Sequence, residues 1–95
     1  MPTNPLMDTR TLRRLAVLGW VLMHAAREGD WKPLDTFVSE TTCERVRVVD
    51  IATDTRNAIG TALADQPVDN PMRQEAVRRV EPHVSQRYRC QPRND

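Results

Sequence analysis

Two cysteines, Cys43 and Cys90, constrain the fold of this chain more than any other pair of residues. The chain has 95 residues, of which 39% are hydrophobic and 4% aromatic, so the core of a single small domain must be thin. Small domains of this kind often need a crosslink, and an even cysteine count is typical of exported domains. We therefore expect a Cys43–Cys90 disulfide, which closes a loop of about 48 residues and contributes about 4 kcal/mol in the chain-entropy model. Two unrelated free thiols in a cytosolic protein are the alternative interpretation.

Residues 1–26 follow the order of a secretory signal. Three arginines between positions 10 and 14 precede an uncharged run over residues 15–23, and small residues follow at positions 25 and 26. The run is far shorter than the roughly 20 residues that cross a bilayer, so we expect no transmembrane segment. Two interpretations stay open for residues 1–26. They are a signal segment that is cleaved after Ala26, or a structural element, which is either a helix over Thr11–Arg27 or a strand over Gly19–Met23.

Residues 27–92 are expected to form one small domain, followed by a tail over residues 93–95. Gly19–Met23 and Trp31–Val38 are rich in apolar side chains and flank a turn-forming stretch over residues 27–30, which predicts a hairpin. Pro33 lacks the N–H group that a central strand needs, so the second strand is predicted at a sheet edge. Tyr88–Cys90 is predicted as a final strand, with Gln91–Asp95 loose.

The main helix is predicted to begin after Ser39, a candidate N-cap, with the Glu40 carboxylate in the first turn, where the helix dipole favours it. Polar side chains that include Arg47, Asp50 and Asp54 are expected to face solvent. Apolar residues recur at helical spacing at Cys43, Val46, Val49, Ala52, Ile59, Ala62 and Leu63. Gly60 weakens the middle of the last stretch of this apolar pattern, which continues through Ile59, Ala62 and Leu63.

A second helix is predicted from Met72 to Val80, because Pro71 suits a helix start and Pro82 a helix end. Together the elements predict an α+β domain, in which two or three short antiparallel strands pack on one main helix. A mostly α fold is the alternative. The predicted core consists of the apolar residues Trp20, Trp31, Leu34, Phe37, Val46, Val49, Ile59, Leu63, Val77 and Val80.

Four landmarks, at Gly19–Met23, Trp31, Phe37–Glu44 and Tyr88–Pro92, form a series along the chain. With them the chain resembles a group of small exported bacterial proteins of unknown function. Those proteins carry tryptophan-containing strands, a Phe-x-Ser-x-x-x-Cys-Glu helix start and a closing aromatic-x-Cys-x-Pro. The stretch over residues 45–87 carries no motif of the group. The resemblance implies export, a Cys43–Cys90 bridge and an uncharacterised role, and it implies no catalytic residue.

The charge balance disfavours nucleic acid as a partner. The chain has 14 basic and 13 acidic residues, for a net charge of +1. A local excess of arginine in the C-terminal third could contact an anion or a partner, although a solvated helix face with a charged tail is the plainer interpretation. Tyr88 is the only aromatic residue in that third, so no stacking surface for bases is predicted. The arginines concerned are Arg73, Arg78, Arg79, Arg87 and Arg89.

No catalytic, metal or cofactor site is predicted. His24 and His83 are the only histidines, and neither they nor the cysteines have the spacing of a metal site. His83 could form a nucleophilic thiol–imidazole pair with Cys43 or Cys90, but a disulfide explains both cysteines more simply. With three glycines the chain has no glycine-rich phosphate loop. We therefore expect a protein that is not an enzyme.

The function predicted from these features is a non-catalytic binding or structural role in the cell envelope, for a periplasmic or secreted protein whose partner could be another protein. The alternative is a cytosolic helical adaptor or regulator, which contacts a partner or nucleic acid through the arginine-rich C-terminal third.

Overall fold

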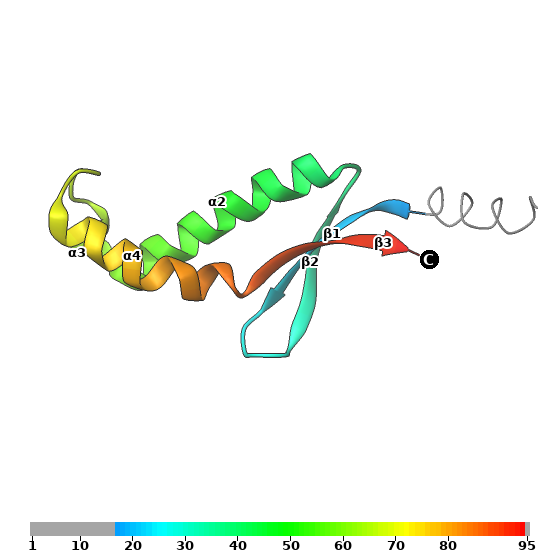
Figure 1. Ribbon diagram of the computed structural model, residues 1–95, viewed down its shortest axis with the longest axis horizontal. Coiled ribbons are helices and arrows are strands. Elements are labelled where there is room, and N and C mark those ends of the chain that lie inside the picture. The colour runs from blue at the N-terminus through cyan, green and yellow to red at the C-terminus, as the bar shows by residue number, and fades with distance from the viewer. Residues whose placement is uncertain (1–16, 95) are drawn as a thin grey trace, which may run out of the picture.

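The structure, a computed structural model, describes residues 17–94 and contains three strands and three helices over that range (Figure 1). The α+β, disulfide-stapled fold that the sequence predicts is confirmed. No helix among these residues is both long and apolar enough to cross a membrane. In chain order the elements are β1 (Val17–Ala25), β2 (Trp31–Phe37), α2 (Glu40–Ile59), α3 (Thr61–Ala64), α4 (Pro71–Ser85) and β3 (Tyr88–Asn94).

The three strands form one antiparallel sheet in the order β2-β1-β3, with β1 in the centre. β1 and β2 form the predicted hairpin, and β2 with its Pro33 lies at an edge, as expected. β3 returns from the helices and pairs with the other side of β1, from Tyr88 opposite His24 to Asn94 opposite Val17. The prediction of a loose C-terminal tail is therefore wrong as far as Asn94, because β1 supplies a hydrogen-bonding partner along its whole length.

The strand β1 corrects the prediction of a helix over Thr11–Arg27. Residues 17–25 are extended and pair on both sides, while Thr11–Ala16 lie outside the described residues. Leu22 from this strand is 1% exposed and belongs to the core. Cleavage after Ala26 would remove the central strand, so this fold requires residues 17–25 to remain in the protein.

The helix α2 begins as predicted, because the Ser39 side chain accepts a hydrogen bond from the Thr42 amide at 3.2 Å. It ends at Ile59, since Gly60 has a φ of 90°, and the short α3 follows. The helix α4 has Pro71 in its first turn, as expected, but continues through Pro82 to Ser85. A proline in the last turn removes one intrahelical hydrogen bond. The loss of this one bond does not terminate the helix.

The core lies between the sheet and the N-terminal half of α2. Its buried members are Leu22, Cys43, Ile51 and Tyr88, and partly buried Trp20, Phe37, Val46, Val84 and Cys90 pack around them. The disulfide joins the first turn of α2 to β3, with 6.1 Å between the two Cα atoms.

Of the ten predicted core residues, only Trp20, Phe37 and Val46 pack on this core cluster. Five others are half-buried outside it, namely Trp31, Ile59, Leu63, Val77 and Val80. The remaining two, Leu34 and Val49, are exposed.

Leu34 is 51% exposed because the β1/β2 pairing shifts between Leu22 and Met23, which leaves Leu34 without a partner in a bulge. Val49 is 61% exposed because α2 turns a different stripe inward. The buried residues of that helix are Cys43, Ile51 and Thr55, which are spaced by multiples of four residues. Half-buried Arg47 and Asp54 lie along the same stripe, so the expectation that they face solvent is wrong.

Candidate binding surfaces

The sheet has a face that the described helices leave uncovered. Trp20 and Leu22 point toward α2, so their neighbours Val21 and Met23 point to the opposite side. Residues paired across the strands share a face, which places Arg89 with Met23 on that same side. We call this side the open face and define it by Val21, Met23, Trp31, Pro33, Thr36, Arg87, Arg89, Gln91 and Arg93.

Three arginines lie beside or on the open face, two in β3 and one in the turn before it. Arg89 and Arg93 pair with Met23 and Gly19 of β1, and alternate residues of a strand point to one side, so these two side chains lie on the same face. Arg87 lies in the turn before β3, where its carbonyl accepts a hydrogen bond from the Ala25 amide at 2.9 Å and its side chain lines a pocket with Trp31. None of the residues that define the open face is acidic. The open face therefore favours a partner with negative charge.

Arg89 is stacked on Trp31 across the central strand. The carbon at the centre of its guanidinium group lies 4.1 Å from the Trp31 ring centroid, a cation–π contact between the two edge strands. No described residue accepts a hydrogen bond from the Arg89 N–H groups. Arg89 is exposed, whereas Trp31 is half-buried. The contact with Trp31 therefore restrains an exposed arginine whose donors stay available to a partner.

A pocket of about 260 Å³ adjoins this stacked pair at the hairpin-turn end of the sheet. Trp31 is common to the pocket and to the stack. One terminal nitrogen of Arg87, Nη1, is buried there without a hydrogen-bond partner among the described residues. The complete lining is Ala25, Glu28, Gly29, Trp31, Gln86 and Arg87.

The five arginines singled out in the sequence do not form one surface. Arg87 and Arg89 share the open face. Arg73 donates to the Gln66 carbonyl at 3.0 Å, beside the start of α4. Arg78 and Arg79 both pair with Glu75, at 2.7 and 2.9 Å. Sequence analysis did not identify Trp31 as a residue of this site and predicted it in the core. Its contact with Arg89 depends on two edge strands that lie far apart in the chain.

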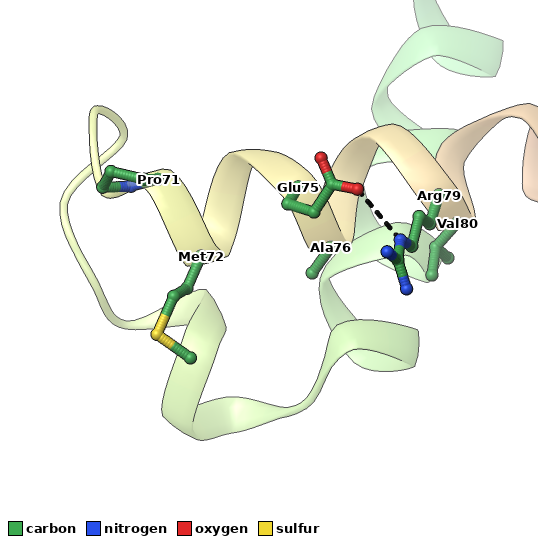
Figure 2. Close-up of a pocket in the computed structure, with 6 residues that line it drawn as sticks. All are labelled: Pro71, Met72, Glu75, Ala76, Arg79 and Val80. Carbon is green, nitrogen blue, oxygen red and sulfur yellow. Dashed lines mark hydrogen bonds and ion pairs between the residues drawn. The ribbon is translucent and has the colours of Figure 1, made fainter.

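A second surface is an open apolar groove along α4 (Figure 2). Met72, Ala76 and Val80 supply its apolar side, and the Glu75–Arg79 ion pair borders it. No residue of α4 is fully buried, and Met72 is 71% exposed. The groove offers apolar area, and its two polar side chains, Glu75 and Arg79, already pair with each other.

A buried polar cluster ties α2 to the start of β3. The Tyr88 hydroxyl donates a hydrogen bond to the Asp54 carboxylate, and the Tyr88 ring lies 4.6 Å from the His24 ring. Arg47 donates to the Tyr88 carbonyl at 3.4 Å. Burial raises the pKa of Tyr88 well above its ordinary value, and the hydrogen bond and charge of Asp54 raise it further. The cluster stabilises the junction between the helices and the sheet.

Among residues 17–94, no group of three or more histidine, cysteine or acidic residues could hold a metal ion. No protein-family model matches the chain. No curated protein and no solved structure matches it either. The resemblance to small exported bacterial proteins therefore stays a prediction from the sequence.

Proposed function

We propose that this protein is an exported domain of the cell envelope, stabilised by its disulfide, which acts by binding a partner rather than by catalysis. The observation that carries the proposal is the Cys43–Cys90 disulfide, whose Cys43 is fully buried in the core. Structural disulfides persist in oxidising compartments and are rare in the cytosol.

The open face supports a binding role. It combines half-buried apolar side chains at Val21, Met23 and Trp31 with the exposed guanidinium of Arg89. Binding surfaces typically join an apolar or aromatic centre with arginine and a polar rim. By contrast, Arg78 and Arg79, which the cytosolic alternative would use, already have a carboxylate partner in Glu75.

The proposal is tested by the intact mass of the protein from its own host, after thiols are trapped under acid and alkylated. We expect a chain two hydrogens lighter than the reduced form and free of alkylation, in the envelope or the medium. Its N-terminus should lie at or before Val17, because β1 is the central strand. A chain in the cytosol with both cysteines alkylated would overturn the proposal in favour of the cytosolic adaptor.

A further inference from the structure

We propose that the open face binds an acidic segment of a partner protein, with Arg89, held by Trp31, receiving a carboxylate. This inference rests on the proposed binding role and identifies the site and the chemistry of the partner.

The first support is the orientation of Arg89. The central carbon of its guanidinium lies 4.1 Å from the Trp31 ring centroid, and no described residue accepts a hydrogen bond from its N–H groups. A guanidinium binds a carboxylate edge-on through two parallel hydrogen bonds. Because the contact with Trp31 already restrains the side chain, less side-chain freedom is lost when the carboxylate binds.

The second support is charge complementarity over more than one residue. Arg89 lies in β3 and Arg87 lies in the turn directly before it, and both adjoin Trp31, Arg89 through the cation–π contact and Arg87 through the shared pocket. Two positive charges beside one ring favour a segment that carries more than one acidic residue. The buried Nη1 of Arg87, without a hydrogen-bond partner among the described residues, adds positive charge at the pocket.

The third support distinguishes a peptide from a polyanion. The arginines on this face lie at one side of half-buried Val21 and Met23, with uncharged Thr36 and Pro33 at the other side, and Glu28 lines the adjoining pocket. The whole chain has a net charge of +1. A nucleic acid draws most of its affinity from many phosphate contacts, which this surface does not offer. Acidic side chains that alternate with apolar ones fit both the arginines and the apolar strip.

The edge strands of the sheet disfavour pairing with an added strand, so the partner segment is expected to bind across the open face. Pro33 interrupts the donors of β2 and Pro92 those of β3, so both edge strands are poor templates for an added strand. The partner segment is therefore held by its side chains on the open face.

The test measures binding of the full-length oxidised protein to a fluorescent peptide that alternates aspartate and valine, at low ionic strength. The comparison peptide has asparagine in place of every aspartate. We expect the acidic peptide to bind and the asparagine peptide to bind at least about tenfold more weakly, as for the loss of a hydrogen bond to a charged group. Equal affinities, or no binding of the acidic peptide, would overturn the inference.

The variants locate the site. Arg89→Gln should weaken binding of the acidic peptide about tenfold or more. Arg89→Lys keeps the charge but not the paired donors, so it should recover only part of the affinity. Arg79→Gln is the matched control, because Arg79 is an exposed arginine that already pairs with Glu75, and it should bind like the parent. Circular dichroism checks that each variant is folded. Equal weakening by Arg79→Gln and Arg89→Gln would contradict the proposed site.

A single-stranded RNA probe tests the other class of partner. RNA that binds more tightly than the acidic peptide, and that depends on Arg89, would overturn the choice of a protein partner. The experiments distinguish failure of this inference from failure of the proposed function. If the protein is exported and oxidised but does not bind the acidic peptide, only the inference is overturned. If the protein is cytosolic and reduced but binds the peptide through Arg89, only the proposed export is overturned.

Discussion

At Gly19 the central strand passes so close to β2 that a side chain has no room. The residue has a φ of 143°, and a Cβ atom there would lie 2.6 Å from the Phe37 carbonyl oxygen. We predict that Gly19→Ala lowers the free energy of unfolding by at least about 2 kcal/mol, since strain and a backbone clash act together. Urea unfolding of the oxidised protein measures the change.

Gly29 provides the control for that prediction. It also has a positive φ, of 82°, but apart from its chain neighbours no atom lies within 4 Å of the position that a Cβ atom would take. Gly29→Ala should therefore lose only about 1 kcal/mol, the cost of the left-handed conformation alone. Equal losses at the two positions would show that contact with Phe37 is not what requires glycine at position 19.

The Tyr88 hydroxyl makes the free energy of unfolding depend on pH in the alkaline range. Burial, followed by Asp54, raises its pKa in the folded protein above the ordinary value of 10.0. The stabilisation is therefore complete below pH 10, and it is lost as pH rises from there toward the folded pKa. We predict that the free energy of unfolding falls above pH 10 and that Tyr88→Phe flattens this fall.

The Tyr88→Phe substitution should also lower the free energy of unfolding by about 1 kcal/mol at neutral pH, because the hydrogen bond to Asp54 is lost. Urea unfolding across the pH series measures both effects. The chain has one tyrosine, and Lys32 is the single lysine, so few other groups titrate in this range. The same alkaline slope in the parent and in Tyr88→Phe would contradict the assignment.

At the scale of elements, α4 depends on its N-cap. The Asn70 side chain accepts hydrogen bonds from the Met72 and Arg73 amides, at 2.9 and 3.1 Å. No residue of α4 is fully buried, so packing compensates little for a lost cap. We predict that Asn70→Ala lowers the free energy of unfolding by about 1 kcal/mol and speeds amide hydrogen exchange in the first turn of α4. Asn57→Ala, at an exposed position inside α2, should leave both unchanged or slightly increase stability. Equal effects of the two changes would contradict the role of the cap.

Local signals predicted most element boundaries. Ser39 and Pro71 marked helix starts, and Pro33 with the turn over residues 27–30 marked the hairpin. The inward face of α2 could not be predicted in this way. Apolar spacing favoured Val46 and Val49. Val46 does pack on the core, but the helix leaves Val49 exposed and buries Ile51 and Thr55. The reason is nonlocal, because Arg47 and Asp54 bond to Tyr88, which lies in β3.

At the scale of the whole molecule, the disulfide closes a loop that runs from the first turn of α2 through α3 and α4 to β3. The helices α2 and α4 pack on each other, but α4 buries no residue completely, so the crosslink holds the base of this pair against the sheet. We predict that reduction lowers the free energy of unfolding by about 4 kcal/mol, the chain-entropy value for this loop. Urea unfolding with and without reductant measures it.

The double variant Cys43→Ala/Cys90→Ala is the control, since it should be as unstable as the reduced protein and insensitive to reductant. A parent protein whose unfolding midpoint is unchanged by reduction would show that the sheet and the core hold the helices without the crosslink. That outcome would also weaken the argument from the disulfide to an oxidising compartment.

The sequence by itself determined the disulfide pair, the hairpin, the helix starts and the α+β class, because each depends on cysteine count or on short-range backbone preferences. The tertiary structure alone decided the central place of β1, the inward face of α2 and the candidate site. From the sequence, Arg89 was one of five candidate arginines and Trp31 a predicted core residue. In the structure they lie in contact, because both edge strands pair with β1. Contacts between residues far apart in the chain depend on strand order and register, which local patterns do not encode.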